Sequence, residues 1–578
     1  MEQKNMKALN GIKKAVTAVS YGLFGILSAV VLVFSFLTVI HFRVSEQNDL
    51  FDIVRENIPL LLLSMAAFLV LTFLCLQAQK KREERASAKN CERPPFPWPM
   101  MLAAGGISLF LVLVIRGNAT NDALQLDGIM QEFSAGNYGS LSKGGYLFVY
   151  PFQVTYVLIG QVIAALAGPS HYLVYQLLNV ASILANLYFL YQICWGAFGD
   201  RSVCLVMQLL SMGCWFYYVF ATFVYADLWS FPLQTAALWL ELLYLKRGKL
   251  RFEVGAGICI AAATLLKTNC YIALIAMVVI LILFPVCPGV EGQCADETAS
   301  EGRTLRGTRS NEKSLDKTRE EVSSERKKTG PGKRLARAVL LALMLVLMTK
   351  GSQLAVNFAV AARAGLEKMP SGVPSAAYFA MGMQETEGKY GWYNGTNVAL
   401  FREADYDRAE TVQKAKASME ESIGEFRNSG RYLVKFYAGK FLSQWGDPTC
   451  VSMREMEETR RHTGEFSPLV SSLIFGTGSR ILQWGMNVIH SLIYLGAVCY
   501  VGVLLYRKKK TGTGGISEAE VLLVVFIIGG MLFHELWEAS GRYTMRYYLT
   551  MLPLSAYGIC RLVQKVQKVI RTARGKGK

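Results

Sequence analysis

Charged residues are scarce in this chain. Only 18% of the 578 residues are Asp, Glu, Lys or Arg, whereas 52% are hydrophobic. Soluble globular proteins contain about 25% charged residues, so the composition excludes a string of soluble domains. The charge that is present is unbalanced, with 61 Lys and Arg against 43 Asp and Glu. Basic cytoplasmic loops of a membrane protein are the simplest explanation of that excess, and no nucleic-acid partner is expected.

The sequence motifs of several enzyme classes are also missing. The chain has no GxSxG nucleophile elbow, no GxxxxGKS/T phosphate loop and no HExxH zinc motif, which argues against a serine hydrolase, a P-loop enzyme and a zinc protease. It has five histidines, and its twelve cysteines form no CxxC pair. A histidine-based metal centre is therefore not expected, and the cysteines fit small apolar packing residues.

Long apolar runs are what the chain has in abundance. About 20 apolar residues cross a hydrocarbon core of ~30 Å, and twelve segments qualify as spans. These are 16–42, 57–78, 99–116, 172–195, 202–223, 228–246, 252–268, 270–287, 335–356, 486–506, 519–537 and 546–563. The pattern predicts an all-α, multi-pass protein of the cell membrane with about 12 transmembrane helices. The first run is too long for a signal peptide and lacks a small-residue cleavage site.

Basic clusters orient these spans. They lie at 80–85, 246–251, 303–337, 507–510 and 561–578. The positive-inside rule places them, with both termini, in the cytoplasm. If every apolar stretch before residue 225 crossed the membrane, the basic clusters could not all lie on the cytoplasmic side. We therefore expect that one of these stretches does not cross. The stretch 147–168 contains Pro151 and several polar residues, so we expect a helix that lies in the outer leaflet or re-enters it. The alternative is that 172–195 is the incomplete span.

The runs also divide the chain into regions. We expect a two-span extension (1–98), a membrane core (99–289), a disordered cytoplasmic insertion (290–334), a single transmembrane helix (335–356), an exterior helical subdomain (357–485), and C-terminal transmembrane helices with a basic cytoplasmic tail (486–578). The insertion mixes polar residues with charges of both signs and cannot bury a core. In the subdomain, apolar residues from Val412 to Phe426 recur at helical spacing.

Carboxylates occupy two turns that we expect on the outer face. Asp122 follows the outer end of one span, and Asp227 lies in the turn between two others. An acid at the border between water and a low-dielectric environment suits a general base. The alternative is that each of them merely caps the helix that follows. Asp127, five residues beyond Asp122, is a competing base.

Cations occupy two further outer turns. Lys267 ends a span, and Arg542 and Arg546 lie at the start of the last one. Arginines outside oppose the positive-inside bias, so we expect an anion to hold them, and a guanidinium group suits bidentate contact with phosphate. The alternatives are that Lys267 only snorkels to the interface, and that an arginine pairs with Glu538 or Glu535.

Several short motifs surround these charges. They are Gly136-Asn137-Tyr138, Gly145-Tyr146-Leu147, Tyr150-Pro151-Phe152-Gln153, Tyr225-Ala226-Asp227, Leu266-Lys267-Thr268-Asn269 and Glu538-Ala539-Ser540-Gly541-Arg542-Tyr543. Together with Asp122, this series resembles the integral-membrane glycosyltransferases of the GT-C fold. The nearest group is the bacterial protein O-mannosyltransferase-like branch, which uses a polyprenyl-phosphate sugar. Ala226 stands where that group more often has glycine.

The resemblance covers roughly residues 99–563 and implies a GT-C-like bundle with exterior juxtamembrane helices. It implies inverting transfer of a hexose from a polyprenyl-phosphate donor in the membrane lipid to an acceptor hydroxyl on the outer face. Asp122 would be the base, or Asp127 in its place. Asp227 would orient Lys267 or the acceptor. Relatives differ in metal use, so a divalent metal stays open.

The resemblance also assigns the donor phosphate and the supporting side chains. Lys267, with Arg542 or Arg546, would offset the charge of the departing phosphate. The supporting residues would be Tyr150, Gln153, Tyr225, Asn269 and Glu538. The acceptor class stays open between a glycan, a lipid and a protein.

Two other classes of protein compete with this interpretation. One is an envelope lipid or polysaccharide transporter or flippase without chemistry, and the other is a non-catalytic envelope assembly subunit. A transporter predicts ionisable residues buried in the bilayer, whereas the notable charges here lie at outer span ends. The discriminating observation is whether Asp122, Asp227, Lys267 and Arg542 come together at one outward-facing site.

Overall fold

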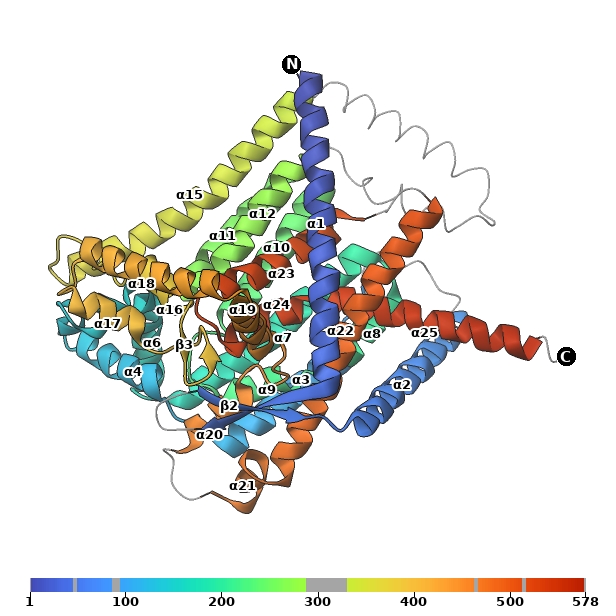
Figure 1. The fold of residues 1–578 in the computed structure, drawn as a ribbon, viewed down its shortest axis with the longest axis horizontal. Coiled ribbons are helices and arrows are strands. Elements are labelled where there is room, and N and C mark those ends of the chain that lie inside the picture. Colours follow the sequence, from blue (N-terminus) through green and yellow to red (C-terminus); the bar gives the residue numbers. More distant parts are fainter. Residues whose placement is uncertain are drawn as a thin grey trace.

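The computed structural model describes residues 2–44, 49–85, 94–286, 330–461, 466–511 and 516–575. Most of the predicted 290–334 insertion lies outside these described residues. The described chain is helical almost throughout (Figure 1). Its helices are therefore those expected of an all-α membrane protein, with the exceptions noted below.

The N-terminal extension contains two helices and an unexpected hairpin. Helices α1 (Glu2–Leu37) and α2 (Ile58–Arg85) flank the antiparallel strands β1 (Thr38–Val44) and β2 (Asp49–Arg55). The prediction of a span over 16–42 was thus wrong at its end. Thr38, Val39 and Ile40 are β-branched and favour the extended backbone, so the helix ends at Leu37.

The membrane core consists of helices that follow the extension. They are α3 (Trp98–Ile115), α4 (Asn121–Ser134), η1 (Gly139–Leu141), α5 (Tyr146–Val149), η2 (Pro151–Gln153), α6 (Val154–Ala167), α7 (Tyr172–Phe198), α8 (Arg201–Met212), α9 (Trp215–Val219), η3 (Phe220–Thr222), α10 (Ser230–Arg247), α11 (Leu250–Leu266), η4 (Thr268–Cys270) and α12 (Tyr271–Leu283). In Figure 1, α10, α11 and α12 lie side by side with the long helix α15 (Pro331–Arg363).

The rest of the chain forms the region that was predicted to be the exterior subdomain, and the last membrane helices. Its elements are α16 (Ser375–Met381), β3 (Glu385–Thr386), β4 (Lys389–Tyr390), α17 (Thr396–Glu403), α18 (Arg408–Asn428), α19 (Gly430–Trp445), α20 (Ser452–Arg461), α21 (Pro468–Ile474), α22 (Thr477–Thr511), α23 (Glu518–Leu536), α24 (Gly541–Thr550) and α25 (Leu552–Gly575). The stretch from Val412 to Phe426, predicted as helical, lies within α18. Ser429 then adopts an extended backbone and caps α19 by accepting from the amide of Tyr432.

Seven helices in the described part of the chain are long and apolar enough to cross a membrane, and up to nine spans result if each of two bent pairs counts as one. This is the pattern of a multi-pass membrane protein, but it does not reach the twelve predicted spans. The shortfall arises partly in α11 and α12, which have 17 and 13 residues. A span needs about 20 residues.

The bent pairs include the stretch that we expected not to cross. The helices of 139–149 and 151–167 meet at an angle of 102°, and the break falls at Tyr150 and Pro151. Proline lacks the amide hydrogen that a continuous helix needs. The break therefore agrees with a re-entrant or interfacial helix at 147–168.

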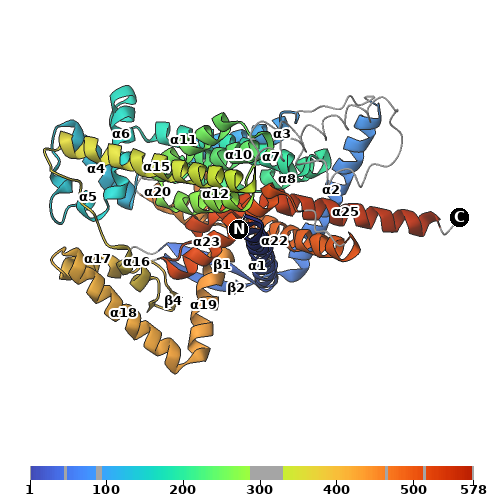
Figure 2. The ribbon, with the colours of Figure 1, turned by 90° about the horizontal axis from the view of Figure 1, so that it is seen from above.

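The exterior subdomain is joined to the membrane helices by a buried lysine. Helices α17, α18 and α19 project to one side of the bundle (Figure 2). From α19, the Lys440 ammonium donates to the carbonyls of Gly382 at 2.5 Å, Trp537 at 2.8 Å and Glu535 at 3.0 Å. Two of these carbonyls lie at the C-terminal end of α23, where the helix dipole favours a cation. Burial lowers the pKa of Lys440 to about 8, so the side chain stays charged at neutral pH.

The substitution Lys440→Met should detach the subdomain from α23. Three carbonyls lose their donor, and we expect a loss of about 3 kcal/mol in the free energy of unfolding. The measurement is the thermal unfolding midpoint in detergent, together with limited proteolysis between α16 and α20. Lys416→Met on α18, where the side chain is exposed, is the matched control. Equal midpoints and equal proteolysis for the two variants would contradict the role of Lys440.

Candidate functional site

Charged side chains from three separate turns meet beyond the ends of α10 and α11. Asp227 lies between η3 and α10, and Lys267 lies just past the end of α11. The Lys267 ammonium is 2.5 Å from Asp227 Oδ1, and Arg542 Nε of α24 is 3.7 Å from Asp227 Oδ2. Asp227 is 3% exposed, so this is a buried ion-pair cluster. Asp227 does not cap α10, because Trp229 is the cap residue of that helix. Lys267 does not snorkel freely, because its ammonium is paired with Asp227.

Aromatic rings surround the two cations. Lys267 Nζ lies 5.2 Å from the ring centre of Tyr225 and 5.7 Å from that of Tyr543. The Arg542 guanidinium lies 5.7 Å from Phe223, 5.8 Å from Tyr225 and 5.7 Å from Tyr543. Cations within about 6 Å of an aromatic face are attracted by its negative quadrupole. The rings therefore hold both cations beside Asp227.

The pKa values of this cluster show an excess of positive charge. Burial alone would raise the pKa of Asp227, but the charges of Lys267 and Arg542 outweigh burial and lower it. Burial also lowers the pKa of Lys267, and the neighbouring Arg542 adds to that shift against the opposing effect of Asp227. The neighbouring cations cause the shift of Asp227, whereas burial is the largest cause of the shift of Lys267. Lys267 and Arg542 therefore share the single carboxylate of Asp227.

Arg546 has a different position from the one that the sequence suggested. Its guanidinium donates to Gln234 at 2.8 Å, to Cys270 Sγ at 3.0 Å and to Ser230 at 3.3 Å, and it stacks over Phe231 at 4.9 Å. These partners occupy its donors and join α24 to α10. Arg546 therefore adds positive charge near Asp227 while most of its hydrogen-bonding capacity is used within the protein.

The sequence did not identify Glu455 as part of the site. This residue of α20 is 5% exposed, and its Oε1 lies 3.7 Å from Arg542 and 3.3 Å from Arg454. The alternative was that Arg542 or Arg546 pairs with Glu538 or Glu535, whereas the ion pairs of Arg542 within the described residues are with Asp227 and Glu455. Glu455 stands in a run of charged residues that resembles a solvent-exposed helix. Nothing in the sequence around it indicates that it belongs to a buried site.

A strained turn before α20 positions Glu455. Cys450 and Val451 have positive φ values of 48° and 66°, a conformation that is costly for a β-branched residue. Asp447 holds the turn by accepting hydrogen bonds from the Val451 amide at 2.7 Å and from Thr449. Burial raises the pKa of Asp447 to about 6 although these bonds oppose the shift. A Cβ at Gly541 would lie 2.7 Å from Asp447 Oδ2, so only glycine fits before Arg542.

Asp122 lies in the first turn of α4 and is exposed. Thr120 is the cap residue of this helix, so Asp122 is not its N-cap. Its carboxylate is a hydrogen-bonding partner of the Tyr146 hydroxyl. It also interacts electrostatically with the Tyr225 hydroxyl, which interacts with Asp227 as well. Tyr225 thus connects the exposed carboxylate to the buried cluster.

Asp127, the competing base, faces other partners. It is 8% exposed, and its Oδ2 accepts hydrogen bonds from Ser170 at 2.5 Å, Tyr172 at 3.0 Å and Gln131 at 3.3 Å. These bonds join α4 to the start of α7. A carboxylate with three donors is a structural link, whereas Asp122 is exposed.

The remaining predicted residues lie around the same site. Gln153 donates to the Tyr225 hydroxyl, and Glu538 accepts from the Tyr543 hydroxyl at 3.1 Å. Tyr150 is half-buried at the break between α5 and η2. Asn269 lies in η4, and within the described chain its buried Nδ2 has no hydrogen-bond partner. Gln153 and Glu538 thus contact tyrosines of the Asp227 cluster, whereas Asp127 lies among other partners.

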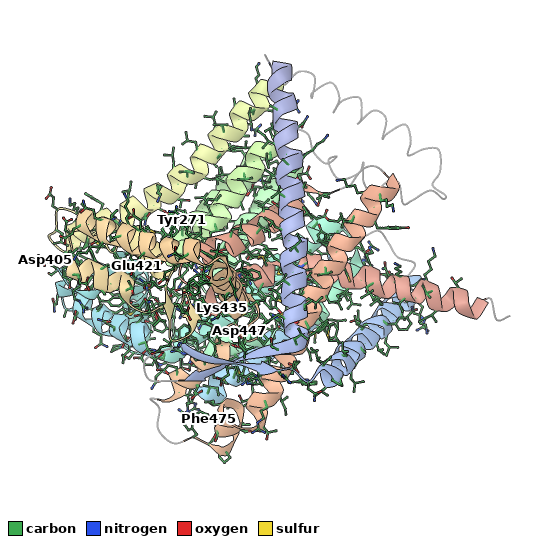
Figure 3. The ribbon with its side chains drawn as sticks, in the orientation of Figure 1. Tyr271, Asp405, Glu421, Lys435, Asp447 and Phe475 are labelled. Atoms are coloured by element: carbon green, nitrogen blue, oxygen red, sulfur yellow. The ribbon has the colours of Figure 1, made fainter. Side chains whose placement is uncertain are left out.

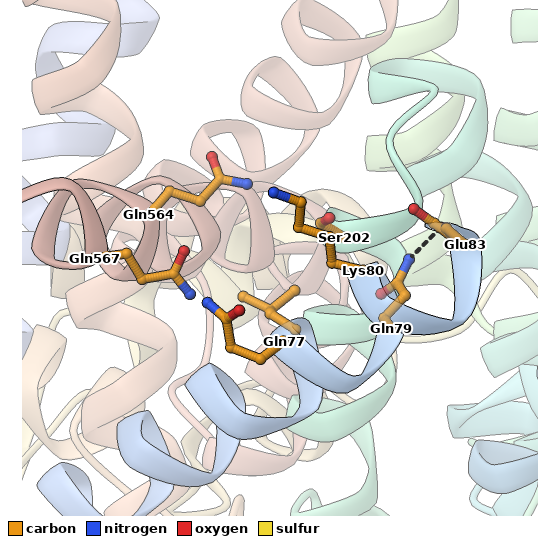
Figure 4. A pocket seen from close by; sticks show the side chains of 8 residues that line it. Gln77, Gln79, Lys80, Glu83, Ser202, Gln564 and Gln567 are labelled. Carbon is orange, nitrogen blue, oxygen red and sulfur yellow. Dashed lines mark hydrogen bonds between the residues drawn. The ribbon is translucent and has the colours of Figure 1, made fainter. Parts of the chain in front are cut away.

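Two features bear on metals and cavities. Across the described ranges, no three His, Cys, Asp or Glu side chains come close enough to hold a metal ion. A cavity of about 280 Å³ lies between the ends of α2, α8 and α25 (Figure 4). Its walls are mainly glutamines, with Lys80 and Glu83, and they include none of the site residues.

No family model and no curated protein matches this chain. The function proposed below therefore depends on the geometry of the site.

The pair Asp227–Lys267 can be tested by a double-mutant cycle. Lys267→Met leaves a buried carboxylate without its nearest partner, and we expect a loss of roughly 3–5 kcal/mol in stability. Adding Asp227→Asn should recover part of that loss. The measurement is thermal unfolding of the two single variants and the double variant. Strictly additive losses would show that the two side chains are not coupled.

Proposed function

We propose that the protein is a membrane glycosyltransferase of the GT-C type. It would move a hexose from a polyprenyl-phosphate donor to an acceptor hydroxyl on the outer face of the cell membrane. One observation carries the proposal: an exposed carboxylate, Asp122, is connected through Tyr225 to a buried, cation-rich cluster. A base beside an anion site is what transfer from a lipid phosphate requires.

The donor phosphate would bind beside Lys267 and Arg542. Their ion pairs use one carboxylate oxygen each on Asp227, and Arg542 also contacts Glu455 at 3.7 Å. Distances of 3.7 Å are longer than a direct hydrogen bond, so Arg542 keeps donors for a ligand. Guanidinium and ammonium groups stabilise the charge that develops on a leaving phosphate.

The chemical step follows from this placement. The Asp122 carboxylate accepts the proton of the acceptor hydroxyl, and the oxygen forms a bond to the anomeric carbon. The bond from that carbon to the phosphate oxygen breaks, and polyprenyl phosphate leaves with the electron pair. Attack opposite the leaving group inverts the anomeric centre. Asp227 takes no proton in this step and orients Lys267.

The expected orientation places both termini in the cytoplasm and the site outside. Salt bridges hold together helix ends that carry basic clusters: Arg201 of α8 lies 3.7 Å from Glu83 of α2, and Arg561 of α25 lies 3.2 Å from Asp200. The positive-inside rule would place this side in the cytoplasm. The polyprenyl chain of the donor would lie in the bilayer beside the core.

One observation favours the transporter alternative. Glu241 and Glu253, on the paired helices α10 and α11, are both fully buried, and among the described residues none of their four carboxyl oxygens has a hydrogen-bond partner. Buried acids in membrane helices are typical of proton and ion pathways. If the protein is a flippase, Glu241→Gln and Glu253→Gln should stop lipid translocation in vesicles, and Asp122→Asn should not.

Asp122→Asn should reduce glycosyl transfer by about 10²–10⁴-fold, because the amide cannot accept the proton. The assay is transfer from a radiolabelled polyprenyl-phosphate hexose by the reconstituted full-length protein. Asp122 is exposed, so the variant should fold normally. Glu132→Gln, an exposed position on the same helix, is the matched control. Wild-type turnover in Asp122→Asn would exclude it as the base.

The pH dependence of donor binding tests Lys267. Its pKa is lowered from 10.5, so the ammonium loses its proton at a less alkaline pH than an ordinary lysine does. We expect the KM for donor to rise on the alkaline side. In Lys267→Arg the guanidinium stays charged, and the rise should move to higher pH. If the KM for donor rises at the same alkaline pH in both proteins, Lys267 does not bind the phosphate.

A further inference from the structure

Aromatic side chains from three parts of the chain gather beside Asp122. Tyr150 comes from the first exterior region, Tyr378 and Tyr393 from the exterior subdomain. Burial is the largest cause that raises the pKa of all three hydroxyls, and the charge of Asp122 adds to it, with a larger contribution from Glu538 at Tyr378 and Tyr393. Tyr150 and Tyr393 share a side-chain hydrogen bond. Asp122 therefore faces a ring-lined region that spans the core and the subdomain.

Two ring pairs form this region. Tyr146 and Tyr150 have ring centres 5.1 Å apart and are tilted by 54° to each other. Tyr378 lies parallel to Trp537, which follows α23, with ring centres 4.8 Å apart and an interplanar angle of 9°. These contacts fix the orientation of the rings before any ligand binds. We call Tyr146, Tyr150, Tyr378, Tyr393 and Trp537 the aromatic surface.

The aromatic surface is accessible. Tyr393 is 51% exposed, and its other four members are half-buried. Tyrosine and tryptophan often lie at the membrane interface as anchors. Here, however, the rings belong to separate elements, and the hydroxyls of Tyr146, Tyr150, Tyr378 and Tyr393 converge near two carboxylates. Besides burial, Asp122 raises the pKa of all four hydroxyls, and Glu538 has the larger effect on Tyr378 and Tyr393. Such convergence is typical of a binding site.

We propose that the aromatic surface is the acceptor subsite and that the acceptor is a glycan. This inference rests on the proposed function. A pyranose ring presents a face of C–H groups to the negative face of an aromatic ring, and its hydroxyls can bond to tyrosine hydroxyls. One such hydroxyl would lie at Asp122, while the donor phosphate lies on the other side of Tyr225.

The surroundings fit a peptide acceptor less well. An extended peptide commonly binds by adding a strand to an exposed sheet edge. The strands of the exterior subdomain, β3 and β4, have two residues each, which is too short for that mode. A lipid acceptor would need an apolar channel, whereas four of the five rings here carry hydroxyl groups.

The subdomain is held in place over this surface. The Val373 amide donates to the Val149 carbonyl at 3.1 Å, and Lys143 pairs with Asp405 at 2.6 Å. Asp405 lies at the outer edge of the molecule in Figure 3. These contacts join the segment of Tyr146 and Tyr150 to the subdomain that supplies Tyr378 and Tyr393.

The experiment compares acceptors in vesicles that contain the full-length protein. A radiolabelled polyprenyl-phosphate hexose is offered with mannotriose, with chitotriose, with a serine- and threonine-rich decapeptide or with diacylglycerol. We expect product on an oligosaccharide only. Tyr393→Ala should raise the KM for that acceptor about tenfold and leave the KM for donor unchanged, whereas Tyr393→Phe should keep most of the affinity. Tyr506→Ala, at a tyrosine of α22 that is 67% exposed, is the control.

A binding measurement separates this inference from the proposed function. Quenching of tryptophan fluorescence by mannotriose or chitotriose needs no chemistry, and it should be weakened in Tyr393→Ala. If the oligosaccharide binds but no hexose is transferred, the proposed function is contradicted and the glycan site is supported. Transfer to the peptide or the lipid with no effect of Tyr393→Ala would overturn the glycan site, as would the absence of both binding and oligosaccharide product.

Discussion

The ion pair between Asp227 and Lys267 is the interaction on which the rest of the site depends. Two cations, Lys267 and Arg542, lie in largely buried positions and would repel each other without an acid between them. Asp227 supplies that acid from a turn between two helices, so the outer ends of α10, α11 and α24 must meet at one point. Removing water from charges costs several kcal/mol per ion, and the surrounding aromatic rings offset part of this cost.

The exterior subdomain depends on an equivalent arrangement. Lys440 crosses from α19 to the end of α23 and satisfies three carbonyls at once. The segment just after α23 carries Trp537 and leads directly to α24 with Arg542. Lys440 therefore helps to set the distance between the subdomain and the cation cluster, together with the contacts of Val373 and Asp405. In the proposed reaction, this is the distance between acceptor and donor.

The sequence was sufficient for the class of fold and for most of the charged residues. Hydropathy shows apolar runs directly, and charges at their outer ends stand out, so Asp122, Asp227, Lys267 and Arg542 could be named in advance. Glu455 could not, because Arg542 is far away in the chain and Glu455 stands in a run of charged residues. The carbonyl partners of Lys440 could not be foreseen either, because they lie 58 to 97 residues away. The β-hairpin could not be predicted from hydropathy, because Thr38, Val39 and Ile40 directly continue the apolar run of α1. Arg546 could be named, but its neutral partners on α10 could not.

The hairpin has a consequence for how this chain evolved. Strand β1 contacts α20, and Phe51 of β2 packs on Trp392 of the subdomain with ring centres 5.5 Å apart. Since α20 carries Glu455, which contacts Arg542, the N-terminal extension is only two contacts away from the site. It is therefore no independent module that could be gained or lost by itself. Changes in residues 38–55 should be inherited together with compensating changes in α20, a covariation across some 400 positions of sequence.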